Sequence, residues 1–109
     1  MMQAAAVVQH YEHILAASAE MVVAATENRW EDLIVLEISR RDLLAEVMAE
    51  SAAPFTDEAL LTRKESSIRG ILAADERVKA LTAVWMTEME GILSSVQAER
   101  KLARAYETG

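Results

Sequence analysis

Two histidines near the N-terminus are the first side chains whose types and spacing could do chemistry. His10 and His13 are three residues apart, with Glu12 beside them, so a helix would place both imidazoles on one face. They could supply two metal ligands, whereas a catalytic or structural zinc site takes at least three from the protein. Because no third ligand with a defined spacing is evident, we predict no metal site and expect both imidazoles to face solvent.

Other signatures of catalysis are missing from the sequence. It contains no Gly-rich phosphate loop, no G-x-S-x-G and no H-E-x-x-H. It has no cysteine, which excludes disulfides, thiolate zinc sites and cysteine nucleophiles and fits a reducing compartment. Catalysis needs polar groups that converge in a dry pocket, and a small Ala- and Leu-rich chain offers little room for one. We therefore expect neither an enzyme nor a bound cofactor.

Composition predicts an all-α protein. The 109 residues suffice for one small domain, 1–109, and 52% of them are hydrophobic, but there are only 3 Gly and 1 Pro. Sheet folds need turn residues about every 8–12 positions, and this sequence does not provide them. The expected fold is an antiparallel helical bundle.

Charge and hydropathy restrict the partners and the location. The net charge of −7 repels phosphate backbones, so we expect no direct contact with nucleic acid. The N-terminus lacks the basic region and long apolar run of a signal peptide. No apolar stretch approaches the roughly 20 residues of a membrane span. A cytoplasmic protein without membrane contact is the simplest prediction.

Apolar spacing predicts a helical hairpin in the first half of the chain. Helix 1 covers about residues 4–26, where Val7, Ile14 and Met21 share one heptad position. Asn28 lies three residues before Glu31, a spacing that resembles a capping box with Asn28 as N-cap. Helix 2 then covers about residues 29–50. A loop this short makes the two helices antiparallel.

A long third helix follows the break at Pro54. Thr56 is the expected N-cap, with Phe55 and Leu60 as a hydrophobic staple, and the helix covers about residues 57–97. Its apolar residues keep heptad spacing throughout, as in Ile71, Val78, Trp85 and Ile92. Since helices 1 and 2 are about half as long, part of this stripe must pack against a second copy, a folded-back tail or a partner.

Several features of helix 3 leave alternatives open. The basic segment 98–109 either continues the helix or forms a short fourth helix after a break near Ser94 and Ser95. Gly70 and Gly91 are either tolerated surface glycines or sites of close backbone approach. Trp85, Met86 and Met89 are either core residues or an adaptable binding surface.

Charged residues within the apolar stripes also permit two interpretations. Glu37 and Arg41 have the i, i+4 spacing of a surface ion pair, although Glu37 could instead make a polar contact across the bundle. Asp75 and Thr82 occupy predicted core positions. They mark a groove edge or a register-setting contact, unless the stripe rotates towards Leu72 and Leu81.

The helix order and motifs resemble the FliT family of flagellar export chaperones. The similarity rests on three stretches: Tyr11-x-x-Ile14-Leu15-x-x-Ser18-x-x-Met21; Trp30-x-x-Leu33-x-x-Leu36-Glu37-x-x-Arg40-Arg41; and Ile68-x-x-Ile71-Leu72-x-x-Asp75-x-x-Val78-x-x-Leu81, followed by a basic stretch and Ala105-Tyr106. It covers nearly the whole chain.

The resemblance implies a cytoplasmic chaperone of flagellar type III export. Such proteins bind the C-terminal region of the filament cap protein, prevent its early assembly and deliver it to the export gate. They also contact export-apparatus proteins, and some repress flagellar genes by binding the master transcriptional regulator.

By matching position, the resemblance also implies a client groove between helices 2 and 3 and a C-terminal segment that can cover it. The implied groove residues are Ile68, Leu72, Asp75, Val78 and Leu81. Leu102 and Tyr106 are the implied regulatory residues of the tail, although a chain that ends three residues after Tyr106 weakens the case for a cover. The alternative is a structural bundle that forms a homodimer through helix 3 and has no client.

Overall fold

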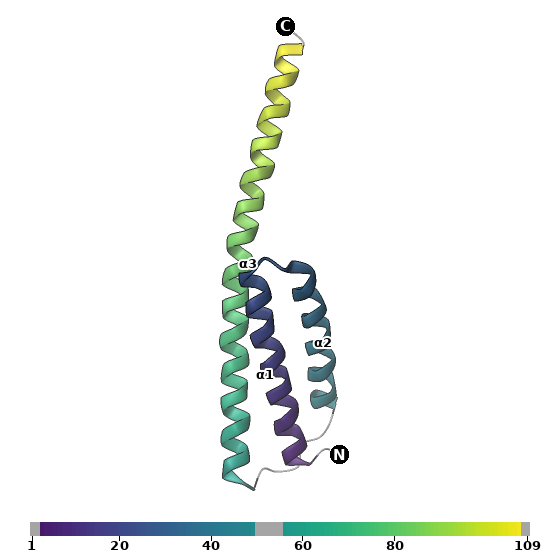
Figure 1. The fold of residues 1–109 in the computed structure, drawn as a ribbon, viewed down its shortest axis with the longest axis vertical. Helices are drawn as coiled ribbons and strands as arrows, with labels where there is room; N and C mark the ends of the chain where they lie inside the picture. Colours follow the sequence, from purple (N-terminus) through teal and green to yellow (C-terminus); the bar gives the residue numbers. More distant parts are fainter. Residues whose placement is uncertain (1–2, 50–55, 108–109) are drawn as a thin grey trace. The chain divides into compact units, whose positions relative to one another are not determined.

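The computed structural model describes residues 3–49 and 56–107. Within these ranges the chain forms three α-helices and no strand: α1 (Ala4–Thr26), α2 (Trp30–Ala49) and α3 (Glu58–Glu107) (Figure 1). The prediction of an all-α bundle is confirmed. The chain divides into two compact units, Met1–Lys79 and Ala80–Gly109, and α3 contributes to both.

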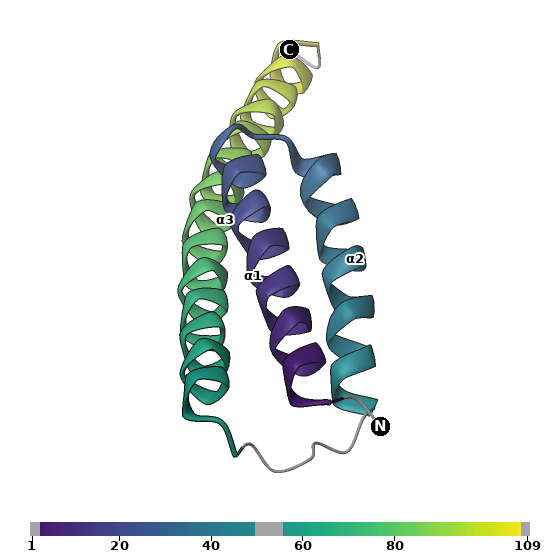
Figure 2. The same cartoon turned by 60° about the horizontal axis from the view of Figure 1, so that its bottom comes forward.

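The first unit is built around α1. Both views show α2 antiparallel to α1 on one side and the first half of α3 along its other side (Figure 1, Figure 2). Because α1 packs on two sides, it buries Val8 and Ala24 as well as the heptad positions Val7, Ile14 and Met21. The central cluster joins Val7 and Ile14 to Val47 of α2, with one side chain from each helix packed around it: Tyr11, Leu43 and Ile71.

The α1–α2 turn corrects the predicted role of Asn28. This residue has a φ of 58° and follows the C-cap Glu27, so it ends α1 and does not cap α2. Its backbone N–H donates to Ala25 at 3.3 Å, and the N–H of Arg29 donates to Ala24 at 2.8 Å. These two bonds form a Schellman motif, in which Asn is accepted because it tolerates the left-handed conformation.

The predicted N-cap of α3 is also corrected by the structure. Asp57, and not Thr56, accepts the free backbone N–H groups of the first turn, from Ala59 at 2.8 Å and from Leu60 at 3.4 Å. A carboxylate at this position also interacts favourably with the helix dipole. The proposed staple partner Phe55 lies outside the described residues.

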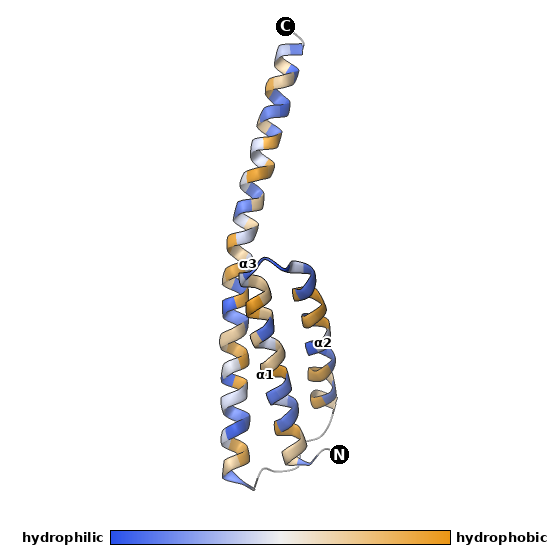
Figure 3. Cartoon of the chain, viewed as in Figure 1, coloured by the Kyte–Doolittle hydropathy of each residue, from blue (hydrophilic) through white to orange (hydrophobic). Residues whose placement is uncertain are grey.

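The second unit is a helix that continues without interruption to Glu107. Of the two alternatives that the sequence left open for the basic segment 98–109, the structure shows continuation of the helix, to Glu107. Ser94 and Ser95 do not break the helix, because neither residue disrupts backbone hydrogen bonding as proline does. Apolar and polar residues are interleaved along this segment (Figure 3). Met86, Ile92, Leu93 and Leu102 are among its exposed large apolar side chains.

Candidate functional site

A groove on the first unit is the candidate functional site. It has a volume of about 280 Å³ and receives side chains from all three helices. Its lining residues are Tyr11 and Ile14 of α1, Arg40 and Leu44 of α2, and Ile68, Ile71, Leu72 and Asp75 of α3. The lining is mainly apolar, with a single pair of opposite charges, Arg40 and Asp75.

The groove brings together three of the five residues implied by the resemblance. Ile68, Leu72 and Asp75 line it, and Leu72 is 59% exposed although it is a leucine. Val78 is half-buried and does not line it, and Leu81 is half-buried in the second unit. The structure adds Arg40 and Leu44 of α2, Ile71 of α3 and two side chains of α1, and Leu44 is 42% exposed.

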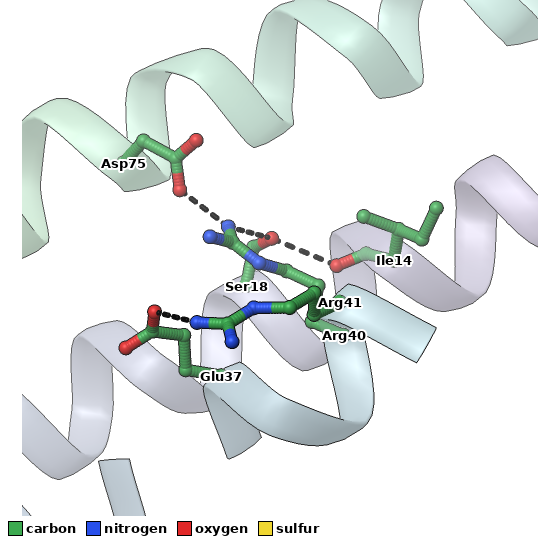
Figure 4. A network of polar contacts seen from close by, with 6 residues as sticks. All are labelled: Ile14, Ser18, Glu37, Arg40, Arg41 and Asp75. Atoms are coloured by element: carbon green, nitrogen blue, oxygen red, sulfur yellow. Dashed lines mark hydrogen bonds and ion pairs between the residues drawn. The ribbon is translucent and has the colours of Figure 1, made fainter. Parts of the chain in front are cut away.

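A polar network joins the three helices of the first unit and includes the two charged residues of the groove (Figure 4). Ser18, which is buried, donates from Oγ to the carbonyl of Ile14 at 2.8 Å and accepts a hydrogen bond from Arg40 Nη1 at 3.1 Å. The same guanidinium forms an ion pair with Asp75. The network therefore links α1, α2 and α3 through one arginine.

Asp75 lines the groove and forms an ion pair with Arg40 of α2, so it makes a polar contact between two helices. Its partner Arg40 was missed, although a signal was present. Arg40 continues the 3-4 spacing of Leu33, Leu36, Leu43 and Val47, so it occupies a core position of α2. A charged residue at a core position of each of two neighbouring helices is the pattern that indicates a pair.

The Glu37–Arg41 contact is a surface ion pair. Arg41 Nη2 lies 2.9 Å from Glu37 Oε1, and the two side chains are 70% and 48% exposed. Glu37 therefore makes no contact across the bundle, and the cross-bundle role belongs to Arg40, whose side chain is only 19% exposed. The two adjacent arginines thus have different functions (Figure 4).

His10 connects α1 to α2. The prediction that its imidazole only faces solvent is therefore wrong. Its Nδ1 lies 3.1 Å from the Ala6 carbonyl and its Nε2 lies 3.0 Å from a carboxylate oxygen of Glu46. Both partners are acceptors, so the imidazole satisfies both contacts only when each nitrogen carries a proton. The hydrogen bond that His10 donates to Glu46, followed by the one that it donates to the Ala6 carbonyl, raises the pKa of His10 above its ordinary value of 6.5.

Contacts between α1 and α3 complete the first unit. Arg63 of α3 pairs with Glu12, and the ammonium of Lys64 lies 5.9 Å from the centre of the Tyr11 ring. Gly70 lies against Leu15, because a Cβ built at Gly70 would be 2.6 Å from Leu15 Cδ1. Of the two alternatives for the glycines, Gly70 is a site of close approach, whereas Gly91 has open space around it.

In residues 3–49 and 56–107, no three His, Cys, Asp or Glu side chains gather as a metal site. Over the same ranges, no helix combines the length and the apolar character that crossing a bilayer requires.

Comparison with known protein families assigns the chain to one of them. A family model described as flagellar protein FliT matches residues 8–108. The chain belongs to the FliT family. The match includes all of the groove residues and the two tail residues. No curated protein and no solved structure matches the chain.

FliT proteins are flagellar export chaperones, a class of binding proteins that are not enzymes. The role of this FliT-family chain is therefore to bind another protein in flagellar export. Its groove, which is apolar and partly open, has the composition expected of a surface that binds a protein helix.

Proposed function

We propose that this chain binds an amphipathic helix from the C-terminal region of the flagellar filament cap protein in the groove of its first unit. The observation that supports this most directly is the exposure of Leu72 and Leu44 in a groove that also contains Ile68 and Ile71. Exposed leucines that meet in a concave site gain stability when a partner covers them. Membership of the FliT family supports the type of client.

Binding in this groove requires no covalent or catalytic step, only the burial of apolar side chains. Full burial of one leucine side chain contributes about 1.5–3 kcal/mol, so two or three such contacts give moderate affinity after the entropy of association is subtracted. The client's apolar face would be hidden while bound, which prevents early polymerisation. Moderate affinity would then permit release at the export gate.

The charged edge of the groove would orient the client. Asp75 has a side chain that is 42% exposed although it pairs with Arg40, so part of its carboxylate remains available to a client donor. A client helix with a Lys, Arg or amide side chain beside its apolar face would complement this edge. Val78 and Leu81 remain proposed as further contacts for the same client.

The same proposal includes the wider partners of the family. The chaperone would act in the cytoplasm, contact export-apparatus proteins during delivery, and contact the flagellar master transcriptional regulator protein to protein. The acidic net charge of −7 agrees with protein contacts in place of DNA contacts.

Substitution of Leu72 tests the groove. We expect Leu72→Asp to abolish binding of the cap protein's C-terminal region in a calorimetric titration, because it places a charge among the groove leucines. Helical circular dichroism should not change, since Leu72 is 59% exposed. Ile34→Asp is the matched control, because Ile34 is similarly exposed at 57% and does not line the groove.

Equal binding by wild type and Leu72→Asp would exclude the groove as the client site. Loss of helicity in Leu72→Asp would show that Leu72 is an ordinary core residue. The same titration with a chain that ends at Gln97 tests the tail. Tighter binding by the shortened chain would support Leu102 and Tyr106 as a cover, and equal binding would contradict it.

A further inference from the structure

A second groove of the first unit lies between α1 and α2, beside the turn that joins them. We define the hairpin groove as the surface lined by Ala19, Glu20 and Val23 of α1, Arg29 of the turn, and Asp32, Val35 and Leu36 of α2. Its volume is about 480 Å³, against about 280 Å³ for the client groove that contains Leu72. The two grooves share no lining residue, so the hairpin groove is a separate site.

The hairpin groove exposes apolar side chains that α1 and α2 leave uncovered. Val35 is 63% exposed and Val23 47%, and Ala19 is exposed beside them. On α2 the exposed apolar surface continues to Ile34 and Ile38, since residues three and four apart are neighbours on a helix. Water is an unfavourable environment for such a surface, and a contiguous apolar patch is typical of a binding site.

The exposed face of α1 carries little charge. Charged residues usually occupy the exposed positions of a surface helix, but Glu20 is the only one here, and residues 4–26 contain no Lys or Arg. Depletion of charge is typical of the centre of a protein interface. The exposed residues of α1 are Ala5, Gln9, His13, Ala16, Ala19, Glu20, Val23 and Thr26.

The rim of the hairpin groove is acidic, which indicates the charge of its partner. Four carboxylates lie in or next to it, those of Glu20, Glu27, Glu31 and Asp32, against the single guanidinium of Arg29. Arg29 already pairs with Glu27 and Asp32, each at 2.7 Å. Glu20 makes no ion pair with any residue that the structure describes. The groove therefore presents an available carboxylate beside exposed valines, which complements a Lys or Arg beside an apolar side chain.

We propose that the hairpin groove binds an amphipathic helix of a second protein, one that carries Lys or Arg along the edge of its apolar face. A helix fits because two antiparallel helices form a furrow along their axes, into which a third helix can lay its apolar residues. The first half of α3 packs along α1 in this way, on the side away from α2 (Figure 1, Figure 2). A basic residue of the partner would pair with Glu20 while apolar residues cover Val23 and Val35.

The site stands apart from the proposed function, but its consequence for export rests on that function. With the cap protein's helix in the client groove and a basic helix in the hairpin groove, the chain would hold two proteins at once. A chaperone that delivers its client needs such a second contact, because the client groove is occupied until release.

Two peptides of about 15 residues test the chemistry of the partner. Both carry leucines at the i, i+3, i+4 and i+7 positions of an amphipathic helix, with lysine at the flanking positions of one and glutamate at those of the other. In titrations followed by fluorescence anisotropy, the full chain should bind the lysine peptide at least about tenfold more tightly than the glutamate peptide. Glu20→Lys and Val35→Ser should each weaken binding of the lysine peptide at least about fivefold, since they remove the ion pair and an apolar contact.

Matched controls separate the hairpin groove from general attraction to an acidic chain. Glu65→Lys makes the same change in net charge at an exposed position of α3 that does not line the groove, and Val84→Ser removes a valine that is 60% exposed. Both should bind the lysine peptide as wild type does, with unchanged helical circular dichroism in all four variants. The proposal fails if the lysine peptide does not bind, or if each control weakens binding as much as its counterpart in the groove.

Competition distinguishes this proposal from the proposed function. A saturating amount of the cap protein's C-terminal region should leave the affinity for the lysine peptide unchanged, and so should Leu72→Asp. Displacement of the peptide would show that the client itself fills the hairpin groove, and tighter peptide binding by a chain that ends at Gln97 would show that the basic tail does; either result overturns the proposal. A chain that binds the peptide through Glu20 but binds no cap protein would refute only the proposed function.

Discussion

At the scale of single residues, two glycines three heptads apart differ in their surroundings. Gly91 has open space where a side chain would be added, whereas Gly70 has Leu15 within contact distance. Ala is favoured over Gly in a helix interior by about 1 kcal/mol. At Gly70 this gain is opposed by the shift of Leu15 away from its preferred rotamer, which costs roughly 0.5–1.5 kcal/mol.

We therefore expect Gly91→Ala to raise helical stability by about 1 kcal/mol and Gly70→Ala to leave it nearly unchanged or lower it. Thermal unfolding followed by far-ultraviolet circular dichroism measures both. Combining Gly70→Ala with Leu15→Ala is a further check, because it removes the clash. A gain for Gly70→Ala equal to that for Gly91→Ala would show that Leu15 does not restrict this position.

Two adjacent arginines form ion pairs that should differ in energy. Arg40 is mostly buried and holds Ser18 and Asp75, whereas Arg41 and Glu37 form an exposed pair on α2. Exposed pairs typically contribute 0.2–1 kcal/mol and hydrogen bonds to charged groups about 1.5–3 kcal/mol, and the 42% exposure of Asp75 reduces the latter value for the Arg40 pair.

Double-mutant cycles for the two pairs measure this difference directly. Arg40→Met with Asp75→Ala should give a coupling energy of about 1 kcal/mol or more, and Arg41→Met with Glu37→Ala only a few tenths. Chemical denaturation of the four variants in each cycle supplies the energies. Equal coupling in the two cycles would mean that the Arg40 network does not define the packing of α1, α2 and α3.

At the scale of elements, the contact between the start of α1 and the end of α2 depends on pH. Glu46 and the Ala6 carbonyl raise the pKa of His10, so its protonated form is favoured in the folded state. The stabilisation is fully present below about pH 6.5, the ordinary His pKa, and is lost as the pH rises through the folded-state pKa.

Wild type should therefore lose more stability than His10→Gln when the pH is raised from acidic to mildly alkaline values. Glu46→Gln should weaken the dependence in the same way, since it removes the largest cause of the raised pKa. Parallel pH profiles for wild type and His10→Gln would contradict the contact.

The elements were predictable from apolar spacing, but the capping residues at two of their ends were not. Apolar residues at heptad spacing predicted three helices, because a helix can bury a continuous row of apolar side chains only when they recur about every 3.5 residues. Asn28 was assigned to the wrong helix because asparagine both caps N-termini and adopts the left-handed conformation that ends a helix. Thr56 and Asp57 are adjacent cap formers, and only the backbone direction decides between them.

The groove was predictable only in part, because periodicity identifies the apolar face of a helix and not what covers it. Ile68 and Leu72 belong to the same face of α3, yet Ile68 is half-buried and Leu72 mostly exposed. Asp75 could be singled out because it interrupts this face. The contribution of α1 and the Arg40 network required the three-helix arrangement, since they depend on side chains far apart in the sequence.

At the scale of the whole molecule, the two units present different apolar surfaces. The first unit presents the groove, and the second presents exposed apolar side chains along the C-terminal part of α3. Each has exposed apolar side chains of the kind that mark binding surfaces. The FliT family match over residues 8–108 includes both, which supports their belonging to one chaperone.

The most direct measurement of the central claim is hydrogen–deuterium exchange of the full chain with and without the C-terminal region of the cap protein from the same organism. Binding in the groove predicts slower exchange in residues 40–47 and 66–78, around Arg40, Leu44, Leu72 and Asp75, with Leu72→Asp abolishing the change. No change in either segment, or protection confined to residues 84–107, would contradict the groove as the site where this chaperone holds its client.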